Sequence, residues 1–87
     1  MIARLAVRVK IFMNELIFFA KRLKETRKLK GQTQKQLAIA TSLSERGYQK
    51  IENGETSPKL ETAIILANIL DVSMDYLLGW SDDPTRH

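Results

Sequence analysis

TQKQLAIATSLSERGYQKIENG, residues 33–54, contains two short helical patterns separated by a tight turn. Thr33 with Gln36 three residues later is a capping box for the first helix, and Ser44 is a favourable N-cap for the second. Asn53 and Gly54 favour the end of the second helix, because both tolerate the left-handed conformation common at helix C-termini. Two short helices joined by a three-residue turn have the dimensions of a helix-turn-helix.

The second of these helices has two different faces. Tyr48 and Ile51 are three residues apart, so a helix places them on one side, where they can pack on a core. Side chains turn by about 100° per residue, and the opposite side therefore collects polar residues. These are Glu45, Arg46, Gln49 and Lys50. We predict a helix anchored by its apolar side, with the polar side free to contact a partner.

Three further helical segments predict an all-α fold of five helices. The first begins after Asn14 as N-cap and ends at Gly31. The fourth is expected with Ser57 as its N-cap and Pro58 at its first position. Its sequence, KLETAIILANIL, is apolar nearly all round, as a central core element would be. A last short helix is expected after Ser73.

The chain divides into an N-terminal extension at residues 1–13, one domain at 14–80 and a polar tail at 81–87. Between residues 3 and 13, apolar side chains alternate with mostly basic ones, which indicates a β-strand. Nothing else in the chain has this pattern. Two alternatives therefore remain open: a strand that pairs with a second copy of the protein, or an irregular or helical extension.

The composition excludes most catalytic chemistry. The 87 residues include no cysteine and a single histidine at the last position, so thiol chemistry, imidazole catalysis, and thiolate or histidine metal sites have no candidate residues. We expect no enzyme activity, no cofactor and no metal. No apolar run is long enough to span a membrane. The N-terminal segment is a poor signal peptide, because basic residues interrupt its apolar part, so a cytoplasmic protein is expected.

The net charge of +4 favours polyanionic partners, although only modestly. Residues 1–30 hold nine Lys/Arg against two acids, whereas residues 31–87 hold five against eight. Basicity alone therefore does not locate a nucleic-acid surface.

Residues 23–79 resemble the Cro/CI-type (XRE-like) helix-turn-helix family of phage and bacterial repressors. Several linked features carry the resemblance: TQKQLA, Leu43-Ser44, KIENG, the proline loop, LETAIILANILDV and SMDYLLG, in this order. The resemblance implies a compact lambda-repressor-like DNA-binding domain with its motif at about residues 34–53. It also implies a transcriptional regulator, expected to be a repressor, that binds double-stranded DNA as a homodimer on a palindromic operator.

The resemblance assigns two sets of site residues. Base-contacting positions fall at Glu45, Arg46, Gln49 and Lys50. Phosphate-contacting positions fall at Thr33, Gln34, Ser44 and Asn53. Arg27 and Glu52 match two family positions that often form a pair, and Arg27 is expected to reach a phosphate as well. Without the resemblance, the serine and threonine are ordinary helix caps and the polar face is an ordinary solvated face.

Three positions depart from the family pattern. Ser42 replaces the usual glycine of the turn, Thr41 replaces an aliphatic residue, and Gly47 lies inside a helix. Two other functions stay open. One is an antitoxin-type protein that uses the same fold to bind a protein partner, and the other is the DNA-binding part of a longer regulator.

Overall fold

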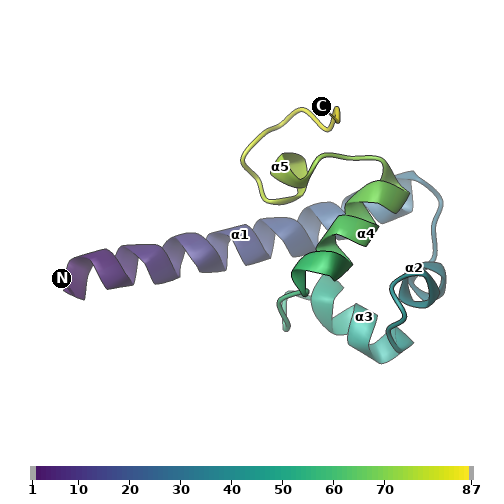
Figure 1. The fold of residues 1–87 in the computed structure, drawn as a ribbon, viewed down its shortest axis with the longest axis horizontal. Helices are drawn as coiled ribbons and strands as arrows, with labels where there is room; N and C mark the ends of the chain where they lie inside the picture. Colours follow the sequence, from purple (N-terminus) through teal and green to yellow (C-terminus); the bar gives the residue numbers. More distant parts are fainter. Residues whose placement is uncertain (1, 87) are drawn as a thin grey trace.

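A computed structural model of the protein describes the backbone of residues 2–86 and the side chains of residues 14–86. Five helices form this part of the chain. The helices are α1 (Ile2–Leu29), α2 (Gln34–Ala40), α3 (Glu45–Glu52), α4 (Leu60–Leu70) and α5 (Met74–Leu77). Figure 1 shows α3 on one side of α1 and α5 on the other, and both helices contact α1. No strand occurs within residues 2–86, so the predicted all-α fold is confirmed.

The N-terminal residues are helical, so of the two alternatives for residues 3–13 the β-strand is wrong and the helical extension is correct. No glycine or proline interrupts residues 2–29, and a helix satisfies its own backbone hydrogen bonds, whereas a lone strand cannot. The sequence also contains a helical spacing, since Leu5, Val9, Phe12 and Leu16 follow one another at intervals of four, three and four. Asn14 consequently lies within α1 instead of capping it, and the first turns of α1 extend past the other helices (Figure 1).

The core lies where the C-terminal half of α1 meets the other four helices. Its largest completely buried side chains are Leu23, Leu37, Tyr48, Leu66, Leu70 and Leu77. Burying each leucine contributes about 1.5–3 kcal/mol, so these contacts dominate the stability of the domain. Only one side of α4 contributes to the core. Contrary to its prediction as an element buried all round, α4 leaves four large apolar side chains between 36% and 74% exposed: Leu60, Ile64, Ile65 and Ile69.

Three of the predicted helix caps are confirmed. Thr33 and Gln36 form the complete capping box of α2, and Ser44 and Ser73 accept hydrogen bonds from backbone N–H groups in the first turns of α3 and α5. The predicted cap of α4 is wrong. Lys59, which has an extended backbone and makes no side-chain cap bond, takes the N-cap position in place of Ser57.

The C-terminal residues 81–86 fold back along the domain. Arg22 of α1 donates hydrogen bonds to the backbone carbonyls of Tyr76 and Ser81 and forms an ion pair with Asp82 at 2.8 Å. Further along, the N–H of Ser73 donates to the Pro84 carbonyl at 3.0 Å. The segment that the sequence predicts as a polar tail is therefore bonded both to α1 and to the start of α5.

The turn between α2 and α3 contains a strained residue. Ser42 has φ 59°, the left-handed region that disfavours side chains with a Cβ atom. Thr41, the second departure in this turn, is buried, and its hydroxyl is satisfied by the carbonyls of Leu37 and Ala38 at 2.7 and 3.1 Å. Strain in the turn is thus confined to position 42.

Replacing Ser42 by glycine should stabilise the domain by roughly 1 kcal/mol, because glycine adopts a positive φ without steric cost. Thermal or denaturant unfolding measures the change. Ser57→Gly is the matched control, since Ser57 is exposed and does not have a positive φ, and it should be neutral or destabilising. Equal effects of the two substitutions would contradict the assignment of strain to Ser42.

Candidate nucleic-acid interface

The α3 helix is fixed to the core along one side. Tyr48 and Ile51 are 0% and 4% exposed, which confirms their predicted role as anchors. Of the residues predicted on the opposite side, Glu45, Arg46 and Lys50 are exposed, and Gln49 is half-buried. A helix held in this way presents its outer side chains from a rigid backbone. Such preorganisation lowers the entropic cost of binding a partner.

Hydroxyl groups lie at the N-termini of both helices of the motif. Thr33 Oγ1 accepts a hydrogen bond from the N–H of Gln36, and Ser44 Oγ accepts one from the N–H of Gly47, both at 3.0 Å. Each hydroxyl can still donate its own proton, because it is used only as an acceptor in these bonds. Both residues are exposed, and their caps therefore leave them able to donate to an anionic ligand.

Gly47 is explained by the same cap. A Cβ atom at this position would lie 3.0 Å from Ser44 Oγ, closer than ordinary van der Waals contact. A larger residue would therefore require the capping hydroxyl of α3 to shift by a small distance. The glycine is costly by its helix propensity, but it leaves the capping hydroxyl of Ser44 unhindered.

Arg27 of α1 and Glu52 of α3 form a buried ion pair. The guanidinium donates to Glu52 through Nε, at 2.9 Å to Oε2, and through Nη2, at 2.8 Å to Oε1. The remaining nitrogen, Nη1, donates to the backbone carbonyl of Gln32 at 3.0 Å. All three nitrogens of Arg27 thus have protein partners, and the predicted contact of Arg27 with a phosphate stays a prediction.

The ion pair shifts the pKa of both of its members. Burial alone would raise the pKa of the Glu52 carboxyl, but hydrogen bonds from Arg27 and Gln34 outweigh burial, and the pKa is lowered. The same hydrogen bond to Glu52 raises the pKa of Arg27. Burial, followed by the proximity of Glu52, raises the pKa of the neighbouring Tyr48 phenol. Near neutral pH the group therefore consists of one cation, one anion and a neutral phenol.

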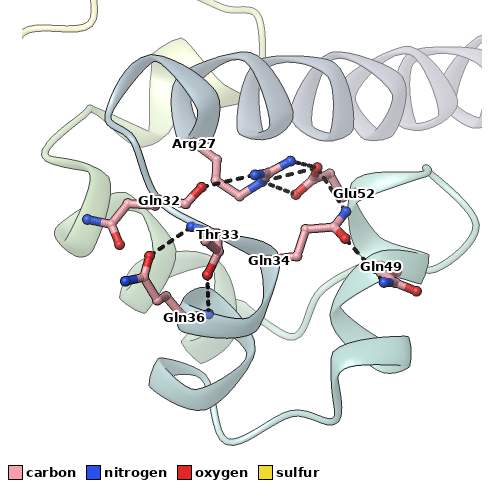
Figure 2. Close-up of polar contacts among 7 residues, drawn as sticks. All are labelled: Arg27, Gln32, Thr33, Gln34, Gln36, Gln49 and Glu52. Atoms are coloured by element: carbon pink, nitrogen blue, oxygen red, sulfur yellow. Dashed lines mark hydrogen bonds and ion pairs between the residues drawn. The ribbon is translucent and has the colours of Figure 1, made fainter.

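Two glutamines connect this ion pair to the outer side of α3. Gln34, the first residue of α2, donates from Nε2 to Glu52 Oε1 at 3.3 Å. Gln49 of α3 donates from its own Nε2 to Gln34 Oε1 at 3.1 Å. Figure 2 shows the resulting chain of contacts, which runs from Arg27 through Glu52 and Gln34 to Gln49. We call these four residues the Arg27–Gln49 relay.

Asn53 lies at the C-terminal end of α3. Its backbone N–H bonds to the carbonyl of Gln49 at 2.9 Å, and its side chain is exposed. The exposed side chain is accessible to a phosphate, and the contact of Asn53 with a phosphate stays a prediction.

The structure thus joins some of the predicted site residues and leaves others separate. Gln34 and Gln49 are in direct contact, whereas Glu45, Arg46 and Lys50 are exposed side chains of α3. The family resemblance implies that Gln34 braces the recognition helix, but it names neither Glu52 nor Gln49 as the partner of Gln34. These residues are 18 and 15 positions apart, on either side of a turn, and no periodic pattern connects them.

Within the described residues, no cluster of three or more His, Cys, Asp or Glu residues has the arrangement of a metal site. The described part of the chain also contains no helix with the length and apolar character that a membrane crossing requires.

Replacing Arg27 by methionine should lower the free energy of unfolding near pH 7 by about 3–5 kcal/mol, because Glu52 is left as a buried, uncompensated charge. In the wild type, the lowered pKa of Glu52 gives stability that is present above the unfolded-state pKa of about 4.5 and is lost as the pH falls through the folded-state value. In the variant, burial without Arg27 should raise this pKa, so mild acidification protonates Glu52 and relieves the penalty. The stability difference should therefore narrow as the pH falls from 7 toward 5.

Denaturant unfolding at several pH values measures this difference. Arg22→Met is the matched control, since its partner Asp82 has a 99% exposed side chain. The control also loses the hydrogen bonds of Arg22 to the Tyr76 and Ser81 carbonyls, so it should lose some stability, with no narrowing of the difference from the wild type over this range. A pH-independent difference for Arg27→Met would contradict the buried ion pair as its cause.

Comparisons with known proteins agree with this architecture. The HTH_3 helix-turn-helix family matches residues 23–77. The chain is 38% identical over 66 residues to the HTH-type transcriptional regulator YobD of Bacillus subtilis, covering 76% of this chain and 59% of the relative. It is also 38% identical over 66 residues to the cryptic phage CTXphi transcriptional repressor RstR of Vibrio cholerae, covering 75% and 59%.

A solved structure is similar as well. The crystal structure of the restriction-modification controller protein C.AhdI from Aeromonas hydrophila superposes with a TM-score of 0.64 at 32% identity, covering 71% of this chain and 94% of that one. The chain spans about three fifths of the length of the curated relatives given above. The matches confirm the resemblance seen in the sequence, and the chain belongs to the HTH_3 helix-turn-helix family.

Proposed function

We propose that the chain binds double-stranded DNA in a sequence-specific manner and acts as a transcriptional regulator, as a repressor. The observation that carries this proposal is the arrangement of α3: Tyr48 and Ile51 are buried, while Arg46 and Lys50 are exposed on a helix that α2 braces. An α-helix fits the major groove of B-DNA, where each base pair presents a distinct pattern of hydrogen-bonding groups. Relatives named as regulators and as a repressor support the same function.

In the proposed complex, α3 lies in the major groove and α2 lies across the backbone. Arg46 donates to guanine O6 and N7, Glu45 accepts from cytosine N4, and Gln49 pairs with adenine, while Lys50 contacts a neighbouring base. Phosphates are contacted by Thr33, Gln34, Ser44 and Asn53, and Arg27 secures the helices from within. Phosphate contacts position the protein, whereas base contacts supply specificity.

The charge of the proposed interface favours selective binding over nonspecific binding. Arg46 and Lys50 attract the DNA backbone, but Glu45, on the same exposed side of α3, repels it. A carboxylate in a DNA interface is favourable only where it accepts a hydrogen bond, as it can from cytosine. The affinity for random DNA should therefore be low and should fall steeply with salt.

We further propose that the active species is a homodimer that binds two half-sites. Leu60, Ile64, Ile65 and Ile69 leave α4 with four exposed apolar side chains, and a second copy of the chain would remove apolar surface of α4 from water. Two identical domains related by a twofold axis match a palindromic operator, since each domain then meets an identical half-site. The strand-paired dimer considered from the sequence is not retained, because residues 2–13 are helical.

Selection from random duplexes at moderate salt should enrich one motif made of two inverted half-sites. Arg46→Ala and Gln49→Ala should each reduce discrimination at one base position by about 1–3 kcal/mol, and together they should erase the preference. Lys24→Ala, at an exposed basic position of α1, is the control and should leave the selected motif unchanged. Recovery of no motif with the wild-type protein would contradict the proposal and would favour the partner-binding alternative.

Replacing both Ile65 and Ile69 by lysine should convert the dimer to a monomer, because the charges would be buried at the interface. Sedimentation measures the mass, and circular dichroism verifies that the helices remain. Deletion of residues 1–12 is the comparison variant and should leave the dimer intact. A monomeric wild type, or loss of the dimer only on deletion of residues 1–12, would contradict the assignment to α4.

A further inference from the structure

The side-chain amide of Gln49 can adopt two orientations, and these present different hydrogen-bonding groups to a base. A glutamine amide has one carbonyl oxygen, which accepts, and one NH₂ group, which donates two hydrogen bonds. Rotation by 180° exchanges these groups while hardly changing the shape of the side chain. Adenine presents a donor and an acceptor in the major groove, whereas guanine presents two acceptors. The orientation of this amide therefore decides which purine suits it.

Glu52 fixes the orientation of the first amide in the relay. An ionised carboxylate only accepts hydrogen bonds, and the lowered pKa of Glu52 keeps it ionised near neutral pH. Gln34 must therefore turn Nε2 toward Glu52 Oε1, from which it lies 3.3 Å. The opposite orientation would place two acceptor oxygens against each other. Arg27 holds the carboxylate still, because it binds both of its oxygens.

The orientation of Gln34 then fixes that of Gln49. With Nε2 of Gln34 directed at Glu52, its Oε1 faces Gln49 and can only accept a hydrogen bond. Gln49 meets this oxygen with Nε2 at 3.1 Å, so its own NH₂ group is turned toward Gln34 (Figure 2). One N–H and the carbonyl oxygen of Gln49 remain for a ligand. The negative charge of Glu52 thus determines, through two amides, which groups Gln49 can present.

We propose that Glu52 and Gln34 are positioning residues that set the Gln49 amide to select adenine and reject guanine; the proposal rests on the proposed function of α3 in DNA binding. The remaining oxygen of Gln49 accepts from adenine N6, and its remaining N–H donates to N7. Guanine would place its O6 acceptor against the same oxygen. A freely rotating amide could turn its NH₂ group toward guanine, whereas the relay prevents this rotation.

The first test uses the protein without DNA. The side-chain amide resonances of Gln49 should be shifted and slow to exchange in the wild type, and both properties should be lost in Gln34→Ala and weakened in Glu52→Gln. Gln32→Ala is the matched control, because only the backbone carbonyl of Gln32 contacts Arg27. Gln34→Ala leaves the ion pair of Arg27 and Glu52 in place, so the test does not depend on a variant that loses stability. Unchanged Gln49 resonances in Gln34→Ala would overturn the relay.

The second test compares the base preferences of the same variants. The relevant base pair is the one at which the Gln49→Ala variant no longer prefers one base over the others. There the ratio of adenine to guanine affinity should fall about fivefold or more in Gln34→Ala and Glu52→Gln, with preferences at other positions and in Gln32→Ala retained. A loss of affinity that is equal for all sequences would overturn the positioning role and leave Gln34 as a phosphate contact. If the wild type selects no motif, the proposed function fails, and the resonance test still decides whether the relay exists.

Discussion

The buried ion pair between Arg27 and Glu52 is the constraint on which the rest of the motif depends. It joins the C-terminal part of α1 to the last turn of α3, and the nitrogen of Arg27 that is left over binds the carbonyl of Gln32 just before α2. The helices α1 and α3 and the turn before α2 are thus tied to one guanidinium. A buried ion pair adds little net stability over an apolar contact, but breaking one is costly, so it specifies a single arrangement of the helices.

This constraint also connects the interior to the proposed DNA surface. Apolar packing of Tyr48 and Ile51 fixes where α3 lies, yet it leaves polar side chains on the other face free to rotate. The relay through Gln34 adds direction, because hydrogen bonds distinguish the two ends of an amide and apolar contacts do not. Arg46 and Lys50, which make no such contact, obtain their orientation only from a ligand.

Most of the fold could be predicted from the sequence because its signals are local. Caps at Thr33, Ser44 and Ser73 and the spacing of Tyr48 and Ile51 depend on neighbouring residues only, and all are present in the structure. The sequence left the N-terminal segment open because residues 3–13 fit both the period of a strand and that of a helix, and continuity with α1 decided between them. The relay was not predictable in detail, since its hydrogen bonds join residues across the turn and depend on rotamers.

The most direct measurement of the central claim is a nuclear magnetic resonance titration of the isotopically labelled chain with a selected operator duplex. The largest resonance changes should fall on α3, at Glu45, Arg46, Gln49 and Lys50, with smaller changes at Thr33 and Ser44. Residues of α4 and α5 outside a dimer interface should change little. Changes centred on α4 or on residues 81–86, with α3 unaffected, would contradict the account.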